Sequence, residues 1–203
     1  MTILVFLTLF SVSLLGAMAP GPSLAVVTKH ALSGGRKNGI ATAWAHASGV
    51  LVYAILTSLG LATLLEHYPL VFKTLTVLGA AYLAYLGVRS LLSKGGLQAQ
   101  IQSGRKASAW RAARDGITIS LLNPKIALFF IALFSQFIAV ADNMAETTLI
   151  VVTPAIIDAL WYTLVAFVLS SSAVVERVQS KAAIIDKLTG GVLILLAVKA
   201  VTL

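Results

Sequence analysis

The sequence contains no cysteine and few charged residues, which are only 11% of its 203 residues. Without cysteine there can be no disulfide framework, no thiol redox centre and no thiolate metal site. Soluble domains carry roughly a quarter charged residues, whereas this chain is 59% hydrophobic with a mean hydropathy of +0.96. A water-soluble fold could not bury that much apolar surface. The composition therefore indicates an integral membrane protein whose solvent is the lipid bilayer.

Motifs typical of enzymes are also missing. The chain has no HExxH, no Walker A and no GxSxG sequence. Its three His and seven acidic residues are scattered without metal-ligand spacing. We therefore expect no catalytic residues, no metal site, no cofactor and no use of ATP. Two alternatives stay open: a membrane-embedded enzyme or assembly factor, which would need a reactive group near an interface, and an efflux path for inorganic ions or metals, which would need a denser ring of acids or His.

Six apolar stretches are long enough to cross a bilayer, at residues 3–28, 38–65, 69–92, 116–140, 146–172 and 185–203. A helical crossing needs about 20 mainly apolar residues. In lipid only helices and closed barrels satisfy their own backbone, and runs of this length exclude a barrel. Residues 1–19 mimic a signal peptide but lack a basic start, so we expect a retained helix. The sequence predicts an all-α membrane fold of six transmembrane helices in one domain, 1–203.

Basic residues gather at alternate connections between these stretches. The net charge of +8 would suggest nucleic acid in a soluble protein, but membrane topology explains it better and we expect no nucleic-acid partner. Twelve of the 15 cations flank three connections: Lys29, Arg36, Lys37, Arg89, Lys94, Arg105, Lys106, Arg111, Arg114, Arg177, Lys181 and Lys187. The opposite connections carry Glu66, Asp142 and Glu146. The positive-inside rule then places the basic connections in the cytoplasm and both termini outside.

The two halves of the chain resemble each other. Leu78–Arg89 aligns without gaps on Leu188–Lys199, and Pro22–Ala25 matches Pro124–Ala127. Chance similarity between apolar helices is the alternative. A duplicated three-helix unit would give halves at about 1–92 and 115–203, joined by the basic loop 93–114. Because three is odd, the second copy would enter the membrane from the opposite side, as in the inverted repeats of many secondary transporters.

Helix-breaking residues interrupt the first and fourth stretches at corresponding places. Pro20, Gly21, Pro22 and Ser23 follow one another in the first, and Asn123 and Pro124 in the fourth. Proline removes a backbone donor and breaks or kinks a helix. Freed backbone groups are tolerated at membrane depth only where they are buried in protein or line a wet cavity. Paired interruptions point to a substrate site; simple packing kinks are the other interpretation.

Ionisable side chains lie well inside the apolar stretches. A charged Lys or Asp at a helix centre costs about 2.5–3.5 kcal/mol on insertion scales, so such residues face the bundle interior and find partners. We expect Lys125 and Asp158 to be coupled, as a structural ion pair or as groups that hold a substrate's carboxylate and ammonium.

Other polar and aromatic residues join these candidates by position. His46 could couple protons, because its charge changes near neutral pH, although a packing role is the alternative. It shares a helix face with Tyr53. Trp161 and Tyr162 lie within one turn of Asp158 and would form a pocket wall, with plain core packing as the alternative for Trp161.

Several blocks together resemble a known family. They are Pro20-Gly21-Pro22-Ser23 through Ser33–Gly39, Gly49–Leu61, Leu83–Arg89, and Leu122-Asn123-Pro124-Lys125 through Phe129-Phe130 to Gln136-Phe137. These residues are similar to the lysine exporter superfamily, most of all to its homoserine and threonine resistance branch, and the likeness adds Gln136 to the candidate site. Two positions depart from the family's pattern: Val50 stands where many members have an acid, and Ser135 where many have proline.

The resemblance implies what such a protein does and where. It implies a multi-pass exporter of the bacterial inner (plasma) membrane that expels amino acids or their derivatives, with homoserine- and threonine-like neutral solutes favoured. The implied coupling is antiport with protons. A homo-oligomer is left open. The loss of the acid at Val50 puts the family's ion coupling in doubt here, with Asp158 or His46 as replacements.

Overall fold

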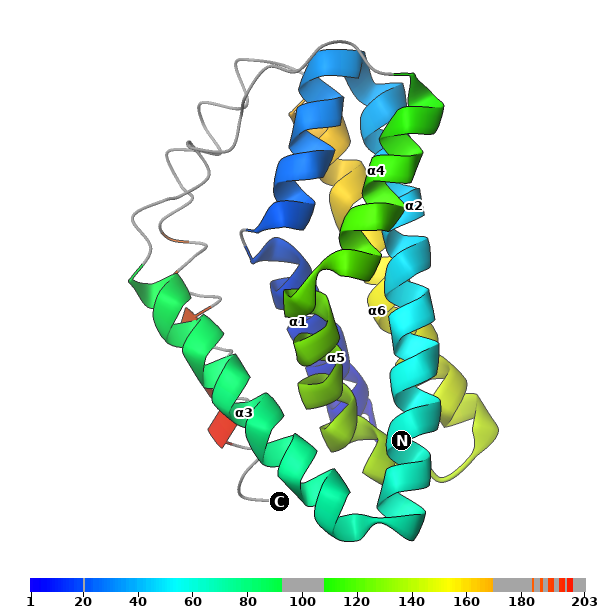
Figure 1. Cartoon of the computed structure of the whole chain (residues 1–203), viewed down its shortest axis with the longest axis vertical. Coiled ribbons are helices and arrows are strands. Elements are labelled where there is room, and N and C mark those ends of the chain that lie inside the picture. The colour runs from blue at the N-terminus through cyan, green and yellow to red at the C-terminus, as the bar shows by residue number, and fades with distance from the viewer. Residues whose placement is uncertain are drawn as a thin grey trace.

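A computed structural model describes residues 1–19, 21–92 and 108–169, together with single positions between 184 and 198. Pro20, most of the loop 93–114 and most of the last apolar stretch, including Lys199, lie outside the described residues. The described elements are α1 (Ile3–Met18), α2 (Pro22–His67), α3 (Pro69–Leu91), α4 (Ala109–Leu122), α5 (Pro124–Phe137), the short 3-10 helix η2 (Ile138–Val140) and α6 (Met144–Val168). Every one of them is helical, which confirms the all-α prediction (Figure 1).

Several helices have the length and composition of membrane spans. Pro22–Gly60 and Met144–Val168 are each long and apolar enough to cross a membrane alone. Ala109–Leu122 and Lys125–Phe137 pass the same test together, bent by 58°. Large apolar side chains also cover the outside, among them Leu56, Leu70 and Leu160, each more than half exposed. Such a surface would promote aggregation in water, so the structure agrees with a membrane protein.

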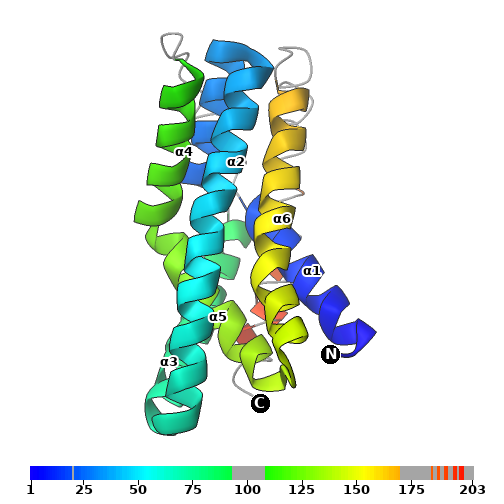
Figure 2. The same ribbon diagram turned by 90° about the vertical axis from the view of Figure 1, so that its right-hand side faces the viewer.

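The first apolar stretch of the sequence contains two successive helices, α1 and the first part of α2. α1 rises to mid-height of the bundle and the first part of α2 continues to one end (Figures 1 and 2). There the chain reverses at Gly35, whose φ of 76° and ψ of −177° are accessible almost only to glycine. The remainder of α2 then runs back along the whole bundle. α4 and α5 form a second passage that is interrupted at Asn123.

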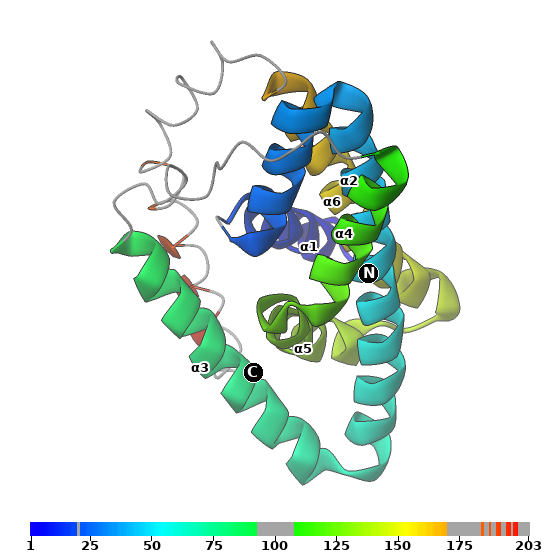
Figure 3. The ribbon, with the colours of Figure 1, turned by 45° about the horizontal axis from the view of Figure 1, so that its top comes forward.

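Close contact between α2 and its neighbours builds the core. A Cβ at Gly116 of α4 would collide with the backbone carbonyl of Thr42 in α2, and one at Gly49 would meet Ser120. α2 and α6 enclose a core around Val27, Ala43 and Val165, and α1, α5 and α6 enclose another. α3 lies along one side, next to α5 (Figure 3). The two broken helices thus meet inside the bundle.

Candidate functional site

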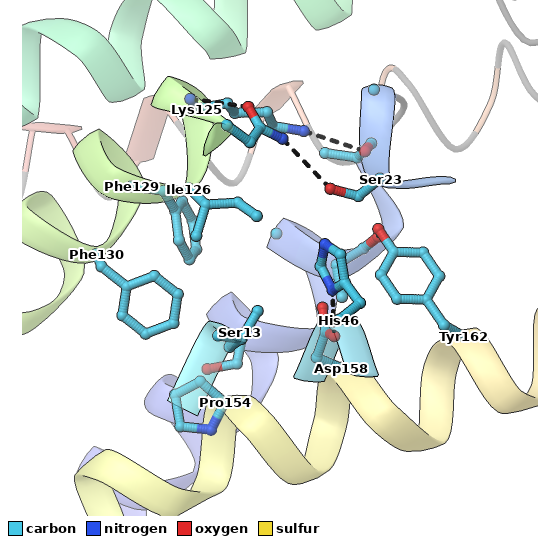
Figure 4. A pocket seen from close by; sticks show the side chains of 16 residues that line it. Ser13, Ser23, His46, Lys125, Ile126, Phe129, Phe130, Pro154, Asp158 and Tyr162 are labelled. Carbon is cyan, nitrogen blue, oxygen red and sulfur yellow. Dashed lines mark hydrogen bonds and ion pairs between the residues drawn. The ribbon is translucent and has the colours of Figure 1, made fainter. Parts of the chain in front are cut away.

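The two helix breaks are in direct contact. Asn123 is the N-cap of α5: its side-chain oxygen accepts a hydrogen bond from the backbone N–H of Lys125 at 3.0 Å. Its amide Nδ2 donates to the hydroxyl of Ser23 at 3.3 Å. The ammonium of Lys125 donates to the carbonyl of Ala19, the C-cap of α1, at 3.1 Å (Figure 4). The breaks that proline predicts separately therefore form one junction.

Local sequence explains why helices restart at this depth. Pro22 and Pro124 are the first residues of α2 and α5, and proline suits a first helical position because its missing N–H would have no partner there. The preceding helices leave carbonyl oxygens without intrahelical donors. Tyr162 donates to the carbonyl of Ala17 at 3.2 Å. Tyrosine and lysine side chains thus satisfy groups that lipid could not.

A cavity of about 50 Å³ lies at this junction. Its polar lining comes from both breaks and from α1, α2 and α6: Ser13, Gly21, Ser23, His46, Asn123, Lys125, Asp158 and Tyr162. Its apolar lining includes Val50, Ile126, Phe129, Phe130 and Pro154. At roughly 10–15 Å³ for each water, the volume admits a few water molecules.

His46 and Asp158 form a hydrogen-bonded pair beside the cavity. His46 Nδ1 lies 2.7 Å from Asp158 Oδ2, and both side chains are buried. The His46 ring also makes an edge-to-face contact with Tyr162, with centroids 5.2 Å apart. Of the two forms of coupling expected for Lys125 and Asp158, the structural ion pair is wrong, because Asp158 pairs with His46 and Lys125 donates to Ala19 on the other break. Both side chains line the cavity, and their binding of substrate charges stays a prediction. The rotation of α2 decides which side chain pairs with Asp158, because it brings the imidazole of His46 next to the carboxylate.

Five of the predicted site residues that the structure describes lie outside the cavity lining: Pro22 and Pro124, which begin α2 and α5, and Tyr53, Gln136 and Trp161. The hydroxyl of Tyr53 donates to the carbonyl of Leu121 at 2.7 Å, near the end of α4. The amide of Gln136 donates to Ala132 O at 3.2 Å, one turn back along α5. Trp161 packs against the core between α2 and α6.

Sequence reasoning missed part of the lining. Ser13, Gly16 and Ala17 of α1 border the cavity, and their spacing of three and four places these small residues on one helix face. That pattern was visible, but small residues also mark ordinary helix packing in membranes. Phe129 and Phe130 sit in a continuous apolar run that gives no sign of which faces are internal. In the described ranges no group of three or more His, Cys, Asp or Glu is placed to hold a metal ion.

Comparison with known proteins identifies the family of this chain. The chain matches the LysE type translocator family over residues 14–203. It belongs to that family of membrane translocators, which confirms the resemblance seen in its sequence blocks.

Relatives from enteric bacteria carry efflux names. Over 148 residues the chain is 30% identical to the threonine efflux protein of Escherichia coli (strain K12), covering 71% of each protein. Over 182 residues it is 30% identical to the leucine efflux protein of Enterobacter sp. (strain 638), covering 89% of this chain and 85% of the relative. The leucine efflux protein of Klebsiella pneumoniae is 35% identical over 126 residues, 61% of this chain and 58% of that protein. No solved structure matches the chain.

Proposed function

We propose that this protein exports neutral amino acids or their derivatives from the bacterial cytoplasm, homoserine- and threonine-like solutes above all, in exchange for protons. The observation that carries the proposal is the meeting of two helix breaks at a cavity with an ammonium, a carboxylate and an imidazole in its lining. Family membership and the efflux relatives support export and an amino-acid substrate.

The cavity suits a zwitterion. Lys125 offers a positive charge to a substrate carboxylate, assisted by the amide dipoles at the start of α2 and α5. Asp158 lies across the cavity on α6 and offers a negative charge to the substrate's ammonium group. The hydroxyl of Ser13 is buried, borders the cavity and has no hydrogen-bond partner among the described residues. It would pair with a hydroxyl on the substrate side chain.

Transport would alternate the access of this cavity between the two sides. The halves 1–92 and 115–203 would be inverted repeats that rock against each other. Asn123 to Ser23, Lys125 to Ala19 and His46 to Asp158 are all contacts between these halves, so rocking would exchange them for contacts with substrate and water. An amino acid has more non-hydrogen atoms than the few waters that fit, so the described cavity must widen to admit one.

The proton gradient supplies enough energy for useful export. One charge moving through about 100 mV releases roughly 2.3 kcal/mol, which sustains a solute gradient of about 50-fold at 1.4 kcal/mol for each factor of ten. The basic connections between apolar stretches support an orientation with those connections in the cytoplasm and both termini outside.

Whole-cell export tests the proposal. Strains that lack or overproduce the protein are loaded with dipeptides containing threonine, homoserine, leucine or lysine, and the free amino acids in the medium are followed with and without a protonophore. We expect a small set of neutral amino acids to leave faster with the protein present, and the protonophore to abolish the difference. Equal release from both strains for every amino acid would refute the proposal.

A further inference from the structure

The hydrogen-bonded pair of His46 and Asp158 joins α2 to α6 beside the cavity. The imidazole comes from α2 and the carboxylate from α6, and their side chains are 2% and 9% exposed. His46 Nδ1 is the nitrogen that faces Asp158. The other nitrogen, Nε2, is buried and has no hydrogen-bond partner among the described residues. Figure 4 shows it on the side of the ring that faces Ser23 and the cavity.

The charges around this pair are few. The titratable side chains that line the cavity with His46 are Asp158 and Tyr162 from α6 and Lys125 from α5. α1 and the start of α2 contribute Ser13 and Ser23, which do not titrate in this range. Asp158 is therefore the one carboxylate among the described lining residues. A buried carboxylate needs a positive partner, because an uncompensated charge in a low-dielectric interior is costly.

We infer that His46 and Asp158 form the coupling site of the exporter, where a proton and the substrate's ammonium group exclude each other. When Nε2 takes a proton, the imidazolium neutralises Asp158 and repels an incoming ammonium group. When Nε2 loses that proton to the cytoplasmic side, the Asp158 carboxylate becomes available and the substrate ammonium replaces the imidazolium. One N–H bond breaks and forms in each cycle, one proton enters and one zwitterion leaves. The inference rests on the proposed export function.

Charge and geometry assign different roles to the two residues. His46 carries the proton but does not bind the solute, whereas Asp158 serves both the proton-loaded and the substrate-loaded state. Exchange of labelled for unlabelled amino acid needs substrate binding but no net proton movement. Uptake driven by an imposed pH gradient needs both. Measured side by side, these two modes therefore separate the roles of the pair.

The test uses the full-length protein reconstituted in liposomes with radiolabelled threonine. In His46→Gln the amide can still donate to Asp158 but cannot bind a proton; we expect exchange within about twofold of wild type and at least a tenfold loss of stimulation by a pH gradient. In Asp158→Asn we expect both modes to fall at least tenfold. His30→Gln is the matched control, because His30 is equally buried and lies 3.0 Å from Asp115, outside the cavity lining. It should respond to the gradient as wild type does.

The outcomes distinguish an error in the coupling site from an error in the proposed export function. If His46→Gln is still driven by the pH gradient, the coupling site is wrong although export stands. If wild type exchanges no amino acid, the proposed function itself fails. If His46→Gln does not fold, proton release from the purified wild type decides: threonine binding should release about one proton for each molecule bound, because linked equilibria are reciprocal. Binding without release would overturn the inference.

Discussion

Asn123 donates a side-chain hydrogen bond to Ser23 over a gap of 100 residues in the chain, at 3.3 Å and fully inside the bundle. The same side chain caps α5 through its oxygen. Asn123 thus starts the helix that follows one break and binds Ser23 at the other break. The two interruptions therefore form a single structural unit beside the cavity.

This double role predicts different effects for two alanine variants. Asn123→Ala loses the cap and the tie, and loss of an N-cap alone costs about 1 kcal/mol. Ser23→Ala loses only the tie. We expect a clear fall in the thermal unfolding midpoint in detergent for Asn123→Ala and a smaller fall for Ser23→Ala, with threonine export reduced in both. Equal, unchanged midpoints in the two variants would contradict the role of Asn123.

Replacing Lys125 by methionine should weaken binding of the substrate carboxylate. The change keeps the aliphatic stem and removes the charge. Hydrogen bonds to charged groups contribute about 1.5–3 kcal/mol, so the concentration of threonine that half-saturates exchange should rise about 10- to 100-fold. Lys73→Met on the exposed face of α3 is the control and should behave as wild type. Wild-type half-saturation in Lys125→Met would show that the ammonium has only a structural role.

Ser13 should set a preference for substrates that carry a hydroxyl. Threonine and valine have nearly the same shape, so their export ratio reports the hydroxyl. In Ser13→Ala we expect this ratio to fall about fivefold, since one neutral hydrogen bond contributes ~1 kcal/mol. Ser11→Ala, exposed on the same helix, is the control. An unchanged ratio would remove Ser13 from the recognition of the side chain.

Gly116 should be intolerant of even one added methyl group. Its Cβ would meet the backbone of Thr42, which cannot move without separating α4 from α2. Overpacking of this kind costs about 1–3 kcal/mol, so Gly116→Ala should lower the unfolding midpoint in detergent. Gly60→Ala is the matched control, because nothing lies within 4 Å of the added atom, and it should leave the midpoint unchanged or slightly raised. The reverse order would contradict the described packing of α2 against α4.

The absence of cysteine makes the orientation directly measurable. A single cysteine introduced at Glu66 or at Lys37, both exposed, is the only thiol in its variant. The proposed topology predicts that a membrane-impermeant maleimide labels Glu66→Cys in intact spheroplasts and labels Lys37→Cys only after permeabilisation. The opposite pattern would invert the orientation and with it the direction of the proton exchange.

The sequence predicts those features that depend on local chemistry. Hydropathy predicts the helices, and the prolines predict the two breaks, because each effect is contained within a few residues. Burial of His46 and Asp158 follows from their cost in lipid. The partner of Asp158 does not follow from the sequence, because His46 and Asp158 are 112 residues apart and their contact depends on the rotation of α2 against α6. Tyr53 binds the Leu121 carbonyl across the bundle, which also depends on helix packing; Gln136 binds the Ala132 carbonyl one turn back in its own helix.

The most direct test of the account is exchange by the purified protein. Liposomes containing it are loaded with unlabelled threonine and placed in a trace of labelled threonine, and accumulation of label is compared with protein-free liposomes and with Asp158→Asn. The account predicts rapid accumulation with wild type, little with the variant and none without protein. No exchange of threonine, homoserine or leucine by a folded wild-type protein would contradict an amino-acid exporter.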